Sequence, residues 1–277
     1  MDNAFFRVDR DGPLVHLVMN RPDKANGMTR EFWSELPRLF ADLDRDESVR
    51  VAIISGEGRN FTGGMDLAAF GSLAQLFAKD PGRAAYAMRD LILELQNAFN
   101  AIERARFPVI APVHGACIGA GIDMITACDL RIASADASFS VEEINIGMAA
   151  DVGTLQRLPK LIAPAVAAEL AYTGRRFSAA EAQGFGLVSS VLADRASLME
   201  AASALARSIA EKSPLAIAGI KRNLAYARDH SVADGLDYIA TWNAGMLRAE
   251  DLLSAVQAKM AKRAATFADL LPPAALG

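Results

Sequence analysis

Two glycine-rich segments, each placed directly after an apolar run, limit this chain to few folds. Residues 61–67 (Phe-Thr-Gly-Gly-Met-Asp-Leu) follow the run 49–55, and residues 115–123 (Gly-Ala-Cys-Ile-Gly-Ala-Gly-Ile-Asp) follow the run 107–113. Glycine lets the backbone adopt positive φ values and approach a ligand closely. The free N–H groups at a helix start favour negative charge. The pattern predicts two tight strand-to-helix turns, which would form an oxyanion hole if they faced each other.

Apolar runs and helical periodicities alternate along the first half of the chain. The predicted strands are 14–19, 49–55, 107–113, 130–134 and 139–141, and the predicted helices are 29–43 and 83–104. Strands separated by helices usually pair in parallel. We therefore expect an α/β core with parallel strands.

After Asp151 the pattern becomes mostly helical. The predicted helices are 154–162, 165–172, 179–184, 195–211, 214–228, 233–246 and 248–263, with a short strand within 187–192. Ser178 and Glu181 fit a capping box at one of these helices. No Gly/Ser-rich or Pro-rich linker separates the two parts of the chain. We expect an α/β core over residues 1–195 and a helical region over residues 196–277.

The composition excludes several classes of protein. A chain of 277 residues buries a large core without disulfides or metals. The net charge of −4 and the scattered Lys and Arg residues do not fit a nucleic-acid-binding protein. The longest weakly charged stretch, 107–126, is broken by proline and glycine, so we expect no membrane span. The charged N-terminal residues do not fit a secretory signal, and we expect a cytoplasmic protein.

Common cofactor and metal motifs are absent from the sequence. It has no complete G-x-G-x-x-G, no phosphate loop, and no HExxH, CxxC or GxSxG. The three histidines are scattered, and His114, at a strand end, is expected to be packed or to cap. Cys117 and Cys128 lack a partner motif and are expected to be buried thiols. We therefore expect no metal and no cofactor.

Carboxylates set among apolar residues mark a candidate acid–base site. Asp123 follows the second glycine turn, Glu142 and Glu143 precede an apolar segment, and Asp151 lies in a run of small residues that ends at Gly153. Such groups have raised and split pKa values when they lie close together, as general acid–base catalysis needs. Two alternatives stay open: a solvated position for Glu142, and a helix cap near Gly153 for Asp151.

Several segments together resemble the crotonase (enoyl-CoA hydratase/isomerase) superfamily over nearly the whole chain. They are residues 20–26 (Asn-Arg-Pro-Asp-Lys-Ala-Asn), the turn 61–67, and the Gly-Ala-Gly turn 119–121 before Asp123, in family order. The resemblance implies a crotonase-type spiral of ββα repeats with a C-terminal helical trimerisation region. It also implies an acyl-CoA thioester substrate, whose oxyanion two backbone N–H groups stabilise. By position these belong to Met65 and to Ala120, where the family commonly has glycine.

The acidic residues favour one reaction within this family. Hydratases carry glutamates at the positions of Asp123 and Glu143 and typically a glycine at that of Asp151. The triplet in this chain resembles the Δ3,5-Δ2,4-dienoyl-CoA isomerases. The resemblance implies that Glu143 and Asp151 transfer the two protons and that Asp123 tunes or hydrogen-bonds one of them. An enoyl-CoA hydratase is the main alternative. Two further alternatives are another isomerase of this family and a non-catalytic acyl-CoA-binding protein.

The resemblance also implies positions that bind the coenzyme A part of the substrate, which is not a separate cofactor. They are Lys24, Ala25, Asn26, Gly64, Asp66, Ala68, Gly119, Lys259, Lys262 and Phe267. Asp66 is expected to be structural rather than catalytic. Lys259 and Lys262 would reach the phosphates of a neighbouring subunit's coenzyme A, with a solvated helix face as the alternative. We expect a homotrimer or a hexamer made of two trimers.

Overall fold

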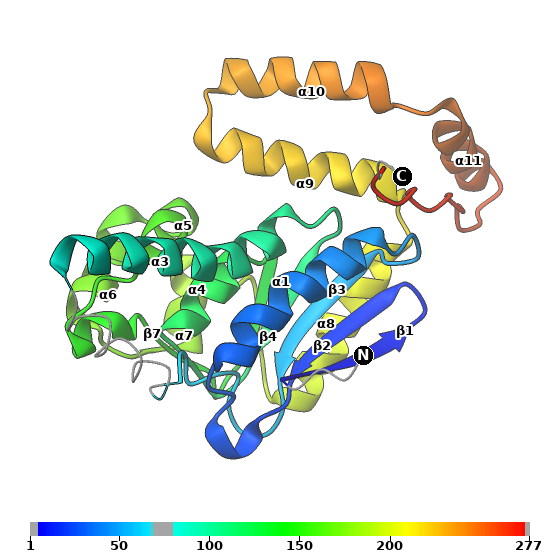
Figure 1. The fold of residues 1–277 in the computed structure, drawn as a ribbon. Coiled ribbons are helices and arrows are strands. Elements are labelled where there is room, and N and C mark those ends of the chain that lie inside the picture. Colours follow the sequence, from blue (N-terminus) through cyan, green and yellow to red (C-terminus); the bar gives the residue numbers. More distant parts are fainter. Residues whose placement is uncertain (1–4, 67, 69–79, 275–277) are drawn as a thin grey trace.

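The computed structural model describes residues 5–66, 68 and 80–274 (Figure 1). A six-stranded sheet has β1 (Phe6–Asp11), β2 (Leu14–Met19), β3 (Val51–Gly56), β4 (Val109–Val113), β6 (Leu130–Ser134) and β9 (Val191–Leu192) in the order β1-β2-β3-β4-β6-β9. β1 and β2 are antiparallel, with Phe6 opposite Met19. The other neighbouring strands in this sheet are parallel.

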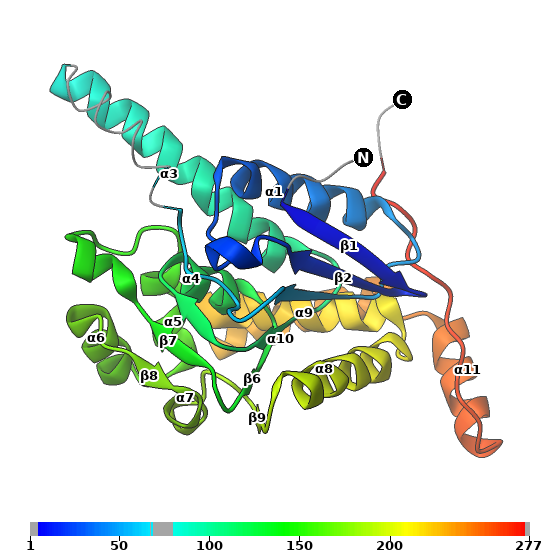
Figure 2. The same cartoon turned by 90° about the horizontal axis from the view of Figure 1, so that it is seen from below.

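Helices cover both faces of the large sheet. They are α1 (Arg30–Arg45) and α3 (Pro81–Arg104) on one face and α8 (Arg195–Ala210) on the other. Successive residues of β3 point to opposite faces, so that Ile54 packs with Phe32 and Phe99, whereas Ile53 packs with Leu198. Figure 2 shows the strands between α1 and α8. Every residue of β3 and β4 is buried, as is typical of parallel strands in a covered sheet.

A second, smaller sheet carries the candidate site. It consists of β5 (Ala116–Ile118), β7 (Ser138–Ser140) and β8 (Phe177–Ser178), in that order. The elements around it are α4 (Ala120–Ala127), the 3-10 helix η3 (Glu142–Ile146), α5 (Thr154–Leu161), α6 (Pro164–Thr173) and α7 (Ala179–Phe185). β5 and β7 are parallel, with Ile118 opposite Ser140. The chain therefore leaves both strands on the same side, which brings the start of α4 next to η3.

Three C-terminal helices lie outside this body: α9 (Pro214–Asp229), α10 (Val232–Met246) and α11 (Ala249–Met260). α9 and α10 lie side by side above the sheet in Figure 1, and α11 lies at one end of the pair. The buried Lys221 anchors α9, because its Nζ donates to the carbonyls of Ile102 and Phe107 and to Asp129. The domain division at residue 195 stays a prediction; α8, which starts there, packs on the sheet.

The helices predicted from residue 154 onward are confirmed to within a few residues at each end. Three strands were not predicted: β1, β5 and β8. The alternating charged residues of β1 resemble a surface segment, and this strand pairs antiparallel with β2. The second glycine-rich segment is more than a turn, because its residues Ala116–Ile118 form β5. In the part of the chain that the structure describes, no helix is long and apolar enough to cross a membrane.

Candidate active site

The first glycine-rich turn presents the backbone N–H of Met65. The Gly63 N–H donates to the Ala25 carbonyl at 2.7 Å. The Gly64 N–H donates to Thr62 Oγ1 at 3.1 Å. Within residues 5–66, 68 and 80–274, no hydrogen bond uses the Met65 N–H as donor. This group is therefore free to bind a ligand oxygen.

The second turn presents the Ala120 N–H at the start of α4. Gly119 has a φ of 52°, and Ala120 is the first helical residue, whose N–H has no acceptor within the helix. No hydrogen bond between described residues uses this N–H either. The two turns touch, since a Cβ on Gly64 would lie 2.6 Å from the Ile118 oxygen and 3.5 Å from the Ala120 nitrogen. The free N–H groups of Met65 and Ala120 thus belong to adjacent backbone segments, as an oxyanion hole requires.

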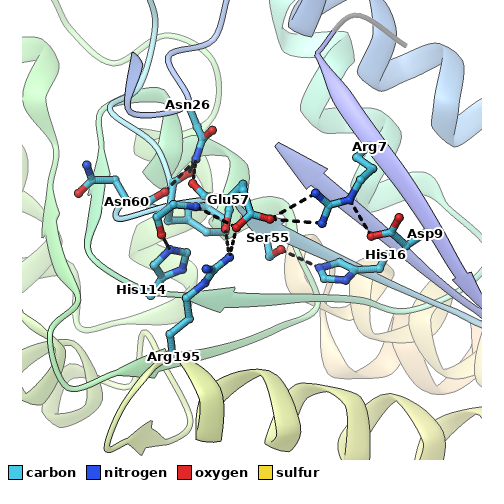
Figure 3. Close-up of polar contacts among 12 residues, drawn as sticks. Arg7, Asp9, His16, Asn26, Ser55, Glu57, Asn60, His114 and Arg195 are labelled. Carbon is cyan, nitrogen blue, oxygen red and sulfur yellow. Dashed lines mark hydrogen bonds and ion pairs between the residues drawn. The ribbon is translucent and has the colours of Figure 1, made fainter. Parts of the chain in front are cut away.

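The Asn26 side chain has a structural role, and its expected contact with coenzyme A stays a prediction. Its side chain is 0% exposed. Its Nδ2 donates to the carbonyls of Glu57 and Asn60, both at 2.9 Å. Figure 3 shows this amide at the loop after β3, where Glu57 also forms ion pairs with Arg7 and Arg195. These contacts fix the loop that leads into the first glycine turn.

His114, Cys117 and Cys128 are buried in the core of the protein. His114 is buried, with Nε2 3.0 Å from the Gly58 oxygen, so it is packed as predicted (Figure 3). Cys117 and Cys128 are buried free thiols. Among the described residues, no three His, Cys, Asp or Glu side chains are placed to hold a metal ion.

Asp123 lies in the first turn of α4 and is fully buried. Its Oδ1 accepts a hydrogen bond of 2.5 Å from the Thr154 N–H, at the start of α5. Its buried Oδ2 accepts no hydrogen bond from the described residues. Asp123 therefore caps α5, whose N-cap position is held by Gly153. Asp123, and not Asp151, thus supplies the side-chain cap of α5 among the described residues.

Glu143 lies on η3 and points at the second glycine turn. A Cβ on Gly119 would lie 3.3 Å from Glu143 Oε1, so this carboxyl group lies beside the residue that precedes the Ala120 N–H. The charge of Asp123 raises the pKa of Glu143, so the two carboxyl groups lie within electrostatic reach of each other. The buried Oε2 of Glu143, like Oδ2 of Asp123, has no hydrogen-bond partner among the described residues. The two groups therefore form a buried carboxyl pair close to the free N–H groups.

Asp151 is half-buried in the segment that leads into α5. Its carbonyl accepts a hydrogen bond of 2.7 Å from Gln96 Nε2 on α3. Its charge raises the pKa values of both Asp123 and Glu143, so it lies within electrostatic reach of the pair. The structure thus brings the three carboxyl groups together, and their catalytic roles stay predictions.

Burial is the largest cause that raises the pKa of each of these three carboxyl groups. At Asp123 and Glu143, repulsion from neighbouring carboxylates raises the pKa further, whereas the Thr154 hydrogen bonds and the charge of Arg157 lower the pKa of Asp123. Carboxyl groups with raised pKa values exchange protons nearer neutral pH. This electrostatic arrangement suits general acid–base catalysis.

Two further charged residues, Glu142 and Arg157, form contacts that the sequence analysis did not predict. Glu142 is half-buried and accepts a hydrogen bond of 2.6 Å from Ser140 Oγ, so it anchors η3. Arg157 was not singled out, because nothing in the sequence distinguishes it from an exposed helix residue such as Lys160. It is 8% exposed, and its Nη2 donates to Asn100 Oδ1 at 2.6 Å. That partner comes from α3, which no local pattern could indicate.

Most of the expected coenzyme A positions lie around the two turns. These are Lys24, Ala25, Gly64, Asp66, Ala68 and Gly119. Lys24 and Ala68 are exposed there. Asp66 forms an ion pair with Arg21 at 3.3 Å, a contact that supports its expected structural role.

The remaining positions lie elsewhere in the chain. Lys259 is on α11, which lies at the opposite end of Figure 1 from α5, and Lys262 and Phe267 follow α11 in the chain. The Phe267 carbonyl accepts a hydrogen bond of 2.8 Å from Arg50 Nη2. One chain alone therefore does not bring these three residues to the carboxyl groups.

An open groove with a volume of about 640 Å³ follows α3 toward the carboxyl groups. Its lining is mainly apolar and consists of Pro81, Ala84, Ala85, Met88, Arg89, Ile92, Leu93 and Gln96. Gln96, at the end of this lining, is the residue that contacts Asp151. An apolar chain in the groove would therefore end near the third carboxyl group.

Comparison with known proteins identifies the family. The family model for enoyl-CoA hydratase/isomerase matches residues 10–269. The mitochondrial Delta(3,5)-Delta(2,4)-dienoyl-CoA isomerase of Homo sapiens is 48% identical over 247 residues, which cover 88% of this chain and 75% of that protein. The peroxisomal Delta(3,5)-Delta(2,4)-dienoyl-CoA isomerase of Arabidopsis thaliana is 45% identical over 266 residues, with coverages of 95% and 96%. The crystal structure of an enoyl-CoA hydratase from Bacillus anthracis matches with a TM-score of 0.87 at 29% identity, covering 95% of this chain and 99% of the other. The chain belongs to the enoyl-CoA hydratase/isomerase family.

Proposed function

We propose that this protein is an enzyme that converts a 3,5-dienoyl-CoA to the 2,4-dienoyl-CoA by proton transfer. The observation that carries the proposal is the third carboxyl group, Asp151, next to the buried pair of Asp123 and Glu143. Water addition across one double bond needs only the pair, whereas a shift of two double bonds needs a second proton-transfer group farther along the chain. The identities of 45% and 48% to named dienoyl-CoA isomerases support the same choice.

Glu143 is the base at C2 in this proposal. The thioester oxygen would lie between the N–H groups of Met65 and Ala120, and C2 is bonded to the thioester carbon. The Glu143 carboxyl group lies beside Gly119, which precedes Ala120, and is therefore close to that position. Removal of the C2 proton gives a dienolate whose negative charge the two N–H groups stabilise. Loss of one such donor lowers the rate about 10²–10³-fold in other enzymes.

Asp151 is the acid at C6. A proton added there, after removal of the C2 proton, leaves double bonds at C2 and C4, so that atoms and charge balance without an oxidant or reductant. The groove along α3 supports this role, because the acyl chain would pass Gln96 and hence Asp151. Each proton transfer is expected to contribute about 10²–10⁴-fold to the rate. Asp123 tunes the base, because its charge raises the pKa of Glu143.

Coenzyme A enters this reaction only as part of the substrate, and we propose that no other cofactor is needed, because proton transfer involves no redox step. Lys24 and Ala68, both exposed beside the first turn, are proposed contacts of the coenzyme A moiety. Lys259 and Lys262 would act on the coenzyme A of a neighbouring subunit. A cytoplasmic location stays a prediction, since the named relatives are mitochondrial or peroxisomal.

A homotrimer, or a hexamer made of two trimers, is the proposed assembly. Large apolar side chains on the three C-terminal helices are exposed in the single chain: Ile220, Leu224, Leu236, Leu253, Val256 and Met260. An apolar surface of this extent normally marks a protein contact. Light scattering of the purified protein tests it, because a mass of three or six chains of 29.5 kDa supports the proposal and a monomer contradicts it.

A paired absorbance assay tests the reaction. One cuvette contains a 3,5-dienoyl-CoA and the other a trans-2-enoyl-CoA. Growth of the conjugated 2,4-dienoyl absorbance in the first, with slow loss of enoyl absorbance in the second, is the expected result. Rapid hydration in the second cuvette with no change in the first would identify a hydratase instead. No reaction in either would contradict both activities.

A further inference from the structure

A stripe of polar side chains on α3 faces the segment that carries Asp151. Gln96, Asn100 and Glu103 are spaced four and three residues apart, so they lie on one face of the helix. Gln96 Nε2 donates to the Asp151 carbonyl at 2.7 Å. Asn100 Oδ1 and Glu103 Oε2 both accept from Arg157 Nη2, at 2.6 and 3.1 Å. α3 thus holds the segment from Asp151 to Arg157 at both its ends.

The Arg157 guanidinium lies directly against the turn that starts α5. A Cβ on Gly153 would lie 1.9 Å from Arg157 Nη1, and Gly153 has a φ of 138°, so glycine is required there. On one side of Gly153 the chain carries Asp151. On the other side, Thr154 donates its N–H to Asp123. A displacement of Arg157 would therefore move both Asp151 and the Thr154 N–H that donates to Asp123.

Arg157 also brings a positive charge to the carboxyl groups. Its attraction lowers the pKa of Asp123, against the effect of burial. Because the side chain is buried, solvent screens this attraction little. The other charged groups around Arg157 are Glu103 on α3, Arg228 and Asp229 on α9, and Asp123 and Asp151.

We propose that Arg157 is a positioning residue for the isomerisation and that the stripe of Gln96, Asn100 and Glu103 keeps it aligned with the catalytic carboxyl groups. The inference rests on the proposed function, because it takes Asp151 as the proton-transfer group at C6. Arg157 contacts no reacting atom. It fixes the separation between Asp151 and the Asp123–Glu143 pair, and a misplacement of about 1 Å in such a group can lower a rate about 100-fold.

The variant Gln96→Met tests the stripe with little risk to folding, because Gln96 is half-buried and bonds Asp151 through one amide hydrogen. We expect kcat to fall about 10-fold, KM to stay within about two-fold, and the thermal unfolding midpoint to stay unchanged. The matched control is Gln183→Met, at an exposed position on α7, which should leave all three values unchanged. A wild-type kcat in Gln96→Met would overturn the role of the stripe.

Variants of Arg157 separate positioning from simple stability. Arg157→Met removes the charge and both hydrogen bonds, so the pKa of Asp123 should rise and kcat should fall about 100-fold. Arg157→Lys keeps the charge and should return the pKa of Asp123 toward that of the wild type, while kcat stays low because an ammonium group lacks the fork geometry of guanidinium. A wild-type kcat in folded Arg157→Met would overturn the inference. If that variant does not fold, the kcat values of Arg157→Lys and Gln96→Met decide it.

An infrared titration of the carboxyl C=O band separates this inference from the proposed function, because it needs no substrate. The expected result is a titration midpoint at higher pH in Arg157→Met than in the wild type. That shift, with a wild type inactive on 3,5-dienoyl-CoA, would contradict the proposed function alone. An unchanged midpoint with an active wild type would contradict the role of Arg157 alone.

Discussion

The Thr154 backbone N–H donates to Asp123 Oδ1 at 2.5 Å, across 31 positions of the chain. The charge of the same Asp123 carboxyl group raises the pKa of Glu143. One carboxyl group thus connects the proposed base to the start of α5, and through the preceding turn to Asp151. Asp123 therefore couples the two proposed proton-transfer groups, and changes at any of the three should affect the others.

Glu143→Gln and Asp151→Asn should each nearly abolish isomerisation. Each change removes one proton-transfer group but keeps the shape of the side chain, so the rate should fall about 10²–10⁴-fold. The assembly should persist in both variants. The dienoyl-CoA assay measures the rate, and light scattering measures the mass. Full isomerase activity in either variant would contradict its assignment, and hydration that survives in Asp151→Asn alone would favour the hydratase alternative.

Asp123→Asn should move the acid limb of the pH profile to lower pH. The charge of Asp123 is one of the causes that raise the pKa of Glu143, and the amide carries no charge. Glu143 would then lose its proton at lower pH, by about one unit. The measurement is kcat/KM of the dienoyl-CoA reaction from pH 5 to 9. Asp90→Asn, at an exposed position on α3, is the matched control and should leave the limb in place.

Glu143→Gln should also stabilise the fold above neutral pH. A carboxyl group whose pKa is higher in the folded than in the unfolded chain binds more protons when folded, so its contribution to stability falls as pH rises from the unfolded to the folded pKa. The amide does not titrate. The thermal unfolding midpoint of the variant should exceed that of the wild type by roughly 2–8 °C at pH 8. The difference should vanish near pH 4; an equal difference at both pH values would contradict the raised pKa.

Local patterns predicted the C-terminal helices well, because their caps are local. The predicted capping box of Ser178 and Glu181 is present. The geometry of the site was harder to predict, because it depends on contacts between segments that are distant in the sequence. Nothing near Gln96 in the sequence shows that it contacts Asp151, 55 positions away. Asn26 shows the same dependence, because its amide donates to buried carbonyls of a distant loop, a contact that no nearby residue indicates.

Gly64→Ala should damage the oxyanion hole. Gly64 has a φ of 86°, and its Cβ would lie 2.6 Å from the Ile118 oxygen, so the two turns must separate. With the Met65 N–H displaced, kcat should fall about 10²–10³-fold. Gly184→Ala is the matched control, since Gly184 lies in α7 with no atom within 4 Å of an added Cβ. Wild-type kcat in Gly64→Ala would show that this turn does not bind the oxyanion.

Lys221→Met should detach α9 from the body and lower stability. The Lys221 side chain is 7% exposed, its Nζ lies 2.7 Å from Asp129 Oδ2, and it also donates to two buried carbonyls. Removal takes this donor from all three acceptors, which in buried pairs costs about 3–5 kcal/mol. The cost is somewhat less here, because Asp129 is partly exposed and its Oδ2 still accepts from the Val109 N–H. Urea unfolding measures the loss. Lys212→Met, at an exposed position, is the control, and equal stability of the two variants would contradict the anchoring role.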